Sequence, residues 1–231
     1  MSVAENYKKV EQRVADACAR AGRSRDEVLL LAVSKLHEPT ELNEAIRAGA
    51  TDLGENRVQE LLAKKDEVLP VRWHLIGHLQ TNKVKQIVPH VVMIHSVDSY
   101  KLAAEIDKRC AAIDKVMDIL IEYNAGMEET KSGVAIDEVE GLIREIGEHL
   151  EHVRVRGIMC IPPIAEDPED ARPYFREAKA LYDHLREAEL PERVMIDTLS
   201  MGMSGDFEVA IEEGSTIVRV GSSIFGKRNY R

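Results

Sequence analysis

Residues 29–55 read LLLAVSKLHEPTELNEAIRAGATDLGE, and this stretch contains one complete strand–helix–strand unit. The apolar run Leu29–Ser34 is typical of a buried strand, because parallel strands covered on both faces are almost continuously hydrophobic. Thr40–Ala48 has helical periodicity and ends at Gly49, a residue that commonly terminates helices. Asp52–Glu55 then begins a second strand. The unit predicts two parallel strands joined by a right-handed crossover.

The same alternation continues along the chain. The predicted strands are short and rich in apolar or β-branched residues: Leu29–Ser34, Asp52–Glu55, Arg72–Gly77, Met93–Val97, Met117–Tyr123, Val153–Ile161, Asp197–Met201 and Thr216–Gly221. Amphipathic segments separate them: Thr40–Ala48, Val58–Val68, Ser99–Ala112, Ile136–His149, Ala171–Ala188 and Phe207–Glu213. This order predicts an α/β fold, a single (β/α)8 TIM-type barrel over residues 1–231, with an extra N-terminal helix at Ala4–Ala21. An open, doubly wound sheet is the alternative.

Composition narrows the class of protein. The chain has 31 Lys and Arg against 41 Asp and Glu, a net charge of -10, which argues against broad nucleic-acid binding. No apolar run approaches the ~20 residues of a membrane span, and the start lacks a secretory signal. The three cysteines are widely spaced, which fits a reducing compartment and predicts neither disulfides nor a metal site. We therefore expect a cytoplasmic protein.

In such a barrel, functional residues lie at the carboxyl ends of the strands. The polar or small residues at these positions are Lys35, Asn56, His78, Ser96, Asn124, Cys160, Ser200–Ser204 and Gly221-Ser222. Lys35 is the sharpest candidate, because it follows a strand with no polar residue before Ser34. Its ammonium group could simply reach solvent. Alternatively, partial burial favours the neutral amine, which attacks an aldehyde to form a Schiff base.

Two glycine- and serine-rich turns follow the seventh and eighth predicted strands. Gly202 and Gly205 flank Ser204 before an amphipathic helix, and Gly221–Ser223 follows the last strand. Free backbone N–H groups in such turns bind phosphate, and these two loops form the usual phosphate site of TIM barrels. The structural alternative is that Ser204 or Asp206 is only a helix N-cap.

Arg219 alternates with Val218 and Val220 in the last strand, so its guanidinium needs a buried partner. A carboxylate of the protein or an atom of a ligand could be that partner. A lysine that binds an aldehyde, a phosphate cradle and a buried arginine together match three groups of pyridoxal 5′-phosphate (PLP): its aldehyde, its phosphate and its ring nitrogen.

Seven segments carry a resemblance to a known family: LLAVSK (Leu30–Lys35), LGENRVQE (Leu53–Glu60), WHLIGHLQTNK (Trp73–Lys83), ETKSG (Glu129–Gly133), RGIMCIPP (Arg156–Pro163), LSMGMSGD (Leu199–Asp206) and TIVRVGSSIFG (Thr216–Gly226). The sequence closely resembles the pyridoxal phosphate homeostasis proteins, fold-type III PLP proteins related to the N-terminal barrel of alanine racemase. The resemblance runs nearly from end to end.

This resemblance implies a set of cofactor-binding residues: Lys35, Asn56, Ser200, Met201, Gly202, Ser204, Arg219, Gly221 and Ser222. Lys35 would hold PLP as a Schiff base (an internal aldimine), and Arg219 would contact the pyridine nitrogen. Asn56 would line the cofactor face. The phosphate cradle would be formed by Ser200, Met201 and Gly202 together with Gly221 and Ser222. His78 and Met203 are further candidates. Lys131 lies in the ETKSG motif, where no role can be derived from the sequence.

The resemblance also implies a function: a monomer that buffers free PLP in the cell and supplies apo-enzymes, without efficient turnover and with no catalytic residues. The N–H groups of an arginine oppose protonation of the pyridine nitrogen and weaken the ring as an electron sink. Alanine racemases take a second acid–base group from an additional C-terminal domain, and here the chain ends at Arg231 with only Tyr230 as a nominal substitute. The alternatives are a PLP-dependent amino-acid racemase with an incomplete, open site and an aldolase whose lysine binds a sugar phosphate.

Overall fold

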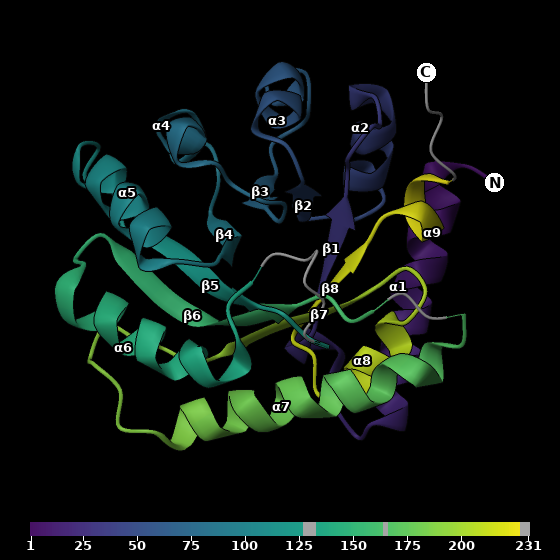
Figure 1. Cartoon of the computed structure of the whole chain (residues 1–231). Helices are drawn as coiled ribbons and strands as arrows, with labels where there is room; N and C mark the ends of the chain where they lie inside the picture. Colours follow the sequence, from purple (N-terminus) through teal and green to yellow (C-terminus); the bar gives the residue numbers. More distant parts are fainter. Residues whose placement is uncertain (127–132, 164–165, 227–231) are drawn as a thin grey trace.

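The strands form a closed parallel barrel in the computed structural model, which describes residues 1–126, 133–163 and 166–226 (Figure 1). Their bounds are β1 Leu29–Val33, β2 Asp52–Glu55, β3 Arg72–Leu75, β4 Met93–Val97, β5 Met117–Tyr123, β6 Val153–Cys160, β7 Thr198–Met203 and β8 Ile217–Val220. Each strand pairs in parallel with the next, and β8 pairs with β1. The predicted barrel is confirmed, and the open sheet is excluded.

Helices surround the barrel, as the sequence periodicity predicts. Their bounds are α1 Val3–Arg20, α2 Pro39–Arg47, α3 Val58–Lys64, α4 Val84–Ile87, α5 Tyr100–Ala111, α6 Val139–His149, α7 Arg172–Glu187, α8 Phe207–Glu212 and α9 Ser222–Phe225. The extra N-terminal helix α1 begins with a capping box, in which Ser2 and Glu5 satisfy each other's backbone N–H groups. It packs against α2, α8 and α9 (Figure 1). The sequence did not predict α4 and α9, because four residues are too few to show a helical period.

Two apolar clusters follow from the alternation of side chains along the strands. The larger one lies between the barrel and the helices and includes Leu30 and Ala32 of β1. The smaller one includes Leu31 of the same strand, together with Met93, Leu120, Met159 and Ile217. Because neighbouring residues of a strand point to opposite faces, this smaller cluster lies inside the barrel. The parity of each strand therefore identifies the residues that face the interior.

Strand β7 departs from the predicted boundaries in a way that matters for the site. The prediction ended it at Met201 and placed the following residues in a loop, but the strand continues to Met203. Gly202 has a φ of 91°, and the pairing with β8 shifts register between Ser200 and Met203. An added Cβ at Gly202 would lie 2.5 Å from Ala210 Cβ of α8. The positive φ and the register shift both come after Ser200. This residue therefore lies within the strand, and its side chain faces the interior.

Substituting Gly157 tests the close approach of two strands. An added Cβ there would lie 1.8 Å from the carbonyl oxygen of Thr198, and φ is 149°. We expect Gly157→Ala to lower the free energy of unfolding in urea by about 3 kcal/mol or more. Gly141 in α6 is the matched control, because nothing lies within 4 Å of an added Cβ. Gly141→Ala should raise stability by about 0.5–1 kcal/mol, and equal effects of the two substitutions would contradict this reading.

Candidate functional site

Lys35 lies at the carboxyl end of β1, two residues after the strand ends. The backbone N–H of Ser34 still donates to the carbonyl of Gly54 in β2 at 2.9 Å, so the backbone before Lys35 is held in the sheet. The next residue, Leu36, has a positive φ of 63°, a conformation that residues other than glycine seldom adopt. The chain therefore turns sharply immediately after the lysine.

Helix α3 holds the backbone on both sides of Lys35. Lys64 Nζ donates to the carbonyl oxygen of Ser34 at 3.0 Å, and Glu60 Oε2 accepts from the N–H of Leu36 at 2.9 Å. Lys64 Nζ also contacts Glu55 Oε1 at 2.6 Å, and both side chains are buried. These bonds fix the strand end from which the lysine projects. Lys64 and Glu60 were not singled out from the sequence, although Lys64 follows Val58 and Leu61 on the apolar face of its helix.

Arg219 of β8 is buried in the barrel interior, 4% exposed. Its Nη1 donates to Ser200 Oγ at 2.8 Å, and its Nη2 donates to the carbonyl oxygen of Cys160 at 2.9 Å. The described part of the chain places no carboxylate within ion-pair distance of this guanidinium. Burial lowers its pKa below the usual range. The sequence left open whether the partner of Arg219 is a carboxylate of the protein or an atom of a ligand. Among the described residues, its partners are two neutral oxygen atoms, from Ser200 and Cys160.

A line of hydrogen bonds continues from Ser200 through the interior of the barrel. Ser200 Oγ lies 3.1 Å from His95 Nδ1, and His95 Nε2 lies 2.9 Å from His74 Nδ1. His74 Nε2 in turn lies 2.9 Å from Asp52 Oδ1. Arg72 binds both oxygens of the Asp52 carboxylate. Neither His74 nor His95 was predicted as a site residue.

The two glycine–serine turns come together through Ser204. The backbone N–H groups of Gly221 and Ser223 both donate to Ser204 Oγ, at 3.1 and 3.4 Å. Two amides from the loop after β8 therefore converge on one oxygen supplied by the loop after β7. Asp206 is the N-cap of α8, and its carboxylate accepts from the N–H of Met203 at 2.6 Å. Of the two residues predicted as alternatives for the helix N-cap, Asp206 is confirmed and Ser204 is wrong.

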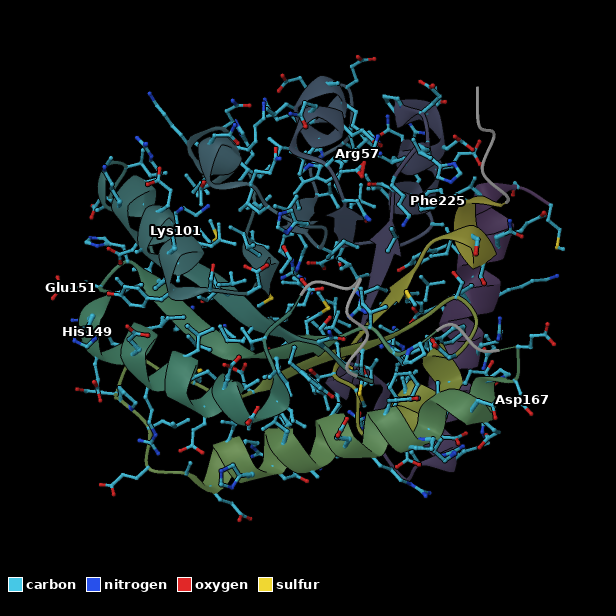
Figure 2. The ribbon with its side chains drawn as sticks, viewed as in Figure 1. Arg57, Lys101, His149, Glu151, Asp167 and Phe225 are labelled. Atoms are coloured by element: carbon cyan, nitrogen blue, oxygen red, sulfur yellow. The ribbon has the colours of Figure 1, made fainter. Side chains whose placement is uncertain are left out.

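The loop after β8 also contacts the loop after β1. Phe225, at the end of α9 (Figure 2), stacks on the imidazole of His37 with ring centroids 4.9 Å apart. Gly221 lies close to β1, and an added Cβ would lie 3.3 Å from Val33 Cβ and from its carbonyl oxygen. The first and last loops of the barrel are thus held side by side.

Asn56 occupies the carboxyl end of β2. Its N–H donates to Glu55 Oε2 at 3.0 Å, whereas its side-chain Oδ1 is buried and has no hydrogen-bond partner among the described residues. A buried polar atom of this kind is costly unless a ligand or water satisfies it. Gly77 packs so closely on the Asn56 backbone that an added Cβ would lie 2.4 Å from its carbonyl oxygen. Asn56 therefore remains a candidate binding residue at this strand end.

The remaining predicted residues take different positions. The side chain of Met201 is buried in the core between barrel and helices, so only its backbone is available to a ligand. Ser222 begins α9 and is exposed. His78 lies at the surface, 3.8 Å from Asp98. Lys131 and Tyr230 lie outside the described residues.

Ser200 is the candidate whose position changes its interpretation. It was predicted as part of the phosphate cradle, but its hydroxyl is buried in the interior and bonds to Arg219 and His95. Successive side chains of a strand point to opposite faces, and this alternation could have predicted from the sequence that Ser200 faces the interior. His74, Ser200 and Arg219 each lie between two apolar residues in their strands. Polar residues at such positions indicate an interior hydrogen-bond network.

Comparisons with known proteins agree with this geometry. The family model for the N-terminal domain of alanine racemase matches residues 3–229. A pyridoxal phosphate homeostasis protein of Aquifex aeolicus is 47% identical over 232 residues, covering 100% of both chains. One from Pseudomonas aeruginosa is 40% identical over 99% of this chain and 97% of its own length. The structure of PipY from Synechococcus elongatus with PLP bound has a TM-score of 0.79 and 32% identity, covering 92% of this chain and 100% of PipY.

Two further surveys concern the described residues alone. They contain no group of three or more His, Cys, Asp and Glu side chains arranged to hold a metal ion. None of their helices combines the length and the apolar character needed to cross a membrane.

The Glu55–Lys64 pair gives a stability prediction. Removing the lysine leaves a buried carboxylate unpaired, so Lys64→Met should lower the free energy of unfolding by about 3–5 kcal/mol. The control is Lys65→Met, because Lys65 pairs with Asp66, whose side chain is 81% exposed. Its effect should stay within about 1 kcal/mol. If urea unfolding shows comparable losses of unfolding free energy for the two variants, the buried Glu55–Lys64 ion pair does not have the predicted role in stability.

Asp52 gives a pH prediction. Burial raises the pKa of its carboxyl, but hydrogen bonds from His74, Arg72 and Thr51 outweigh burial and bring the pKa to about 2, below the usual 3.8. The ionised form therefore stabilises the fold by about 2 kcal/mol above pH ~4, and this contribution disappears as the pH falls towards ~2. The stability difference between the wild type and Asp52→Asn should shrink over that range in urea titrations. A difference that does not change with pH would show that the charge of Asp52 contributes nothing.

Proposed function

Since the chain belongs to the family of the alanine racemase N-terminal domain, with full-length relatives named pyridoxal phosphate homeostasis proteins, we propose that it binds PLP covalently through Lys35 and serves PLP homeostasis. One observation carries the proposal furthest. Arg219 is buried beside neutral oxygen atoms at the same end of the barrel as Lys35 and the glycine–serine loops. A cation in that position suits a ring nitrogen that accepts a hydrogen bond.

The residues present fit each part of the cofactor. Lys35 would take the aldehyde, at a strand end whose backbone is fixed on both sides. The amides of Gly221 and Ser223, which already converge on a hydroxyl oxygen, would take the phosphate together with Ser204. Asn56 offers a buried oxygen that lacks a partner. When bound, PLP supplies an aldehyde and an electron-accepting ring.

We propose that the chain holds PLP without efficient turnover. Arg219 can only donate hydrogen bonds, so it disfavours protonation of the ring nitrogen and weakens the electron sink. Racemisation also needs two acid–base groups on opposite faces of the substrate carbon. Tyr123 is the one tyrosine within a described strand, and it packs in the core outside the barrel interior. Burial raises its pKa well above the usual range, so it is unsuited to proton transfer.

The remaining parts of the proposal concern partners and place. The proposed role is to buffer free PLP and to pass it to apo PLP enzymes. The bonds that hold the backbone around Lys35 and the guanidinium of Arg219 all come from one chain, which supports a site complete in a monomer. Cys18, Cys110 and Cys160 are free and buried, which supports the reducing cytoplasm as its location.

Substituting Lys35 tests the proposal. We expect the wild type mixed with PLP to show a visible absorption band and, after borohydride reduction, a modified peptide that contains Lys35. Lys35→Ala should lose the band and bind PLP at least about tenfold more weakly, through the phosphate loops alone. The control is Lys101→Ala, because Lys101 is exposed on α5 (Figure 2). This variant should keep the wild-type band.

Two outcomes would contradict the proposal. A band that survives in Lys35→Ala would show that another lysine holds the cofactor. Rapid exchange of the α-proton of amino acids in deuterium oxide, catalysed by the PLP-loaded wild type, would favour the racemase alternative over a binder without turnover. A wild type that gains no band after addition of PLP would exclude both.

A further inference from the structure

Five polar side chains form a continuous line through the interior of the barrel. Arg219 and Ser200 begin the line at the proposed cofactor site, and His95 and His74 continue it. Asp52 ends it at the first residue of β2, towards the opposite end of the barrel. The exposed fraction of every member is 4% or less. Nothing in the proposed function requires histidines or an aspartate at these positions, so their presence calls for a physical reason.

The Asp52 end fixes the direction of the first hydrogen bond. Its carboxylate is ionised and can only accept, because its neighbours hold its pKa at about 2. His74 must therefore carry a proton on Nε2 and donate it to Asp52. His74 Nδ1 lies 2.9 Å from His95 Nε2, so one of these two nitrogens donates and the other accepts.

The Arg219 end fixes the direction independently. The guanidinium can only donate, so Ser200 Oγ accepts from it and must place its own hydrogen elsewhere. His95 Nδ1 is the acceptor that the described residues provide for that hydrogen. His95 is then protonated on Nε2 and donates to His74 Nδ1. Burial lowers the pKa of His95 well below its usual value, which agrees with a neutral ring.

One assignment thus satisfies every member with all hydrogen bonds running from Arg219 towards Asp52. Each group donates to the next, and the last acceptor is an anion, so the bonds polarise one another in the same direction. Arg72 already balances the charge of Asp52, and Glu122 and Asp206 are the carboxylates whose charges act on the buried guanidinium. The line therefore contributes oriented hydrogen bonds to Arg219, with no ion pair to it among the described residues. A carboxylate in direct contact would neutralise the guanidinium and compete with a ring nitrogen for its N–H groups.

We propose that Asp52, His74 and His95 are positioning residues that, through Ser200, hold the guanidinium of Arg219 oriented towards the ring nitrogen of the bound cofactor. The part that concerns the ring rests on the proposed function. The part that concerns the hydrogen bonds is a property of the chain alone. Two measurements separate them.

The first measurement uses the cofactor-free protein. Nitrogen-15 NMR of the imidazoles distinguishes the two neutral tautomers, and His74→Gln and His95→Gln assign the signals. We expect each ring to carry its proton on Nε2 and to accept a hydrogen bond at Nδ1. Protonation of His95 on Nδ1, or of both nitrogens of either ring, would overturn the proposal whether or not the protein binds PLP.

The second measurement follows the cofactor. PLP labelled with nitrogen-15 in its ring reports the hydrogen bond to Arg219 through the chemical shift of that nitrogen. Asp52→Asn retains the shape of the side chain and removes its charge, so it should move this signal. Asp118→Asn is the matched control, because Asp118 lies in β5 on the barrel's amino-terminal side and pairs with Arg154 and Arg156. It should leave the signal at the wild-type position.

The outcomes are distinct. Identical ring-nitrogen signals in the wild type, Asp52→Asn and Asp118→Asn would overturn the remote influence of Asp52. A wild type that binds no labelled PLP would overturn the proposed function, while the imidazole tautomers would still decide the hydrogen-bond line. If Asp52→Asn does not fold, the wild-type tautomers provide the same decision without any variant.

Discussion

The pairing of β8 with β1 is the contact on which the rest of the structure depends. It sets Leu31 opposite Arg219 and Ala32 opposite Val220, so that the last strand lies beside the first. Closure removes both edges of the sheet and creates an interior into which alternate residues of every strand point. It also brings the end of β1, which carries Lys35, beside the glycine–serine loop after β8. The site exists because residues almost two hundred positions apart become neighbours.

Burial in the closed interior is costly for polar residues, and the structure offsets part of that cost through hydrogen bonds among Arg219, Ser200 and His95. A TIM barrel is usually filled by layers of bulky apolar side chains, and Leu31, Leu120 and Met159 follow that pattern here. Arg219 and His95 interrupt it. In a medium of low polarity each of their polar atoms needs a partner, so one hydrogen bond determines the next. The same requirement makes the network specific, because replacing one member leaves its neighbours buried without a hydrogen-bond partner.

The surroundings of Lys35 show how the fold prepares a reactive residue. A lysine on a loose loop would sample many positions, whereas here α3 binds the carbonyl before it and the N–H after it. The buried Glu55–Lys64 pair adds little net stability of its own, since desolvation of two charges offsets their attraction. Its value lies in orientation, because groups held by packing and hydrogen bonds present a reactive atom in a defined place.

The sequence alone determined the barrel, its strand boundaries to within about two residues, and the positions of Lys35, Arg219 and the glycine–serine loops. These features follow from local signals: the alternation of strand and helix, the polar residue after an apolar run, and glycines that a tight turn requires. Only the tertiary structure decided that Ser200 supports Arg219 instead of lining the phosphate cradle, that His95 joins His74 to Arg219, and that Lys64 of α3 secures the backbone beside Lys35. Those roles depend on which strands are neighbours and on which side of the sheet a residue faces. Both are set by barrel closure and by the register shift in β7, and each involves contacts between residues distant in the chain.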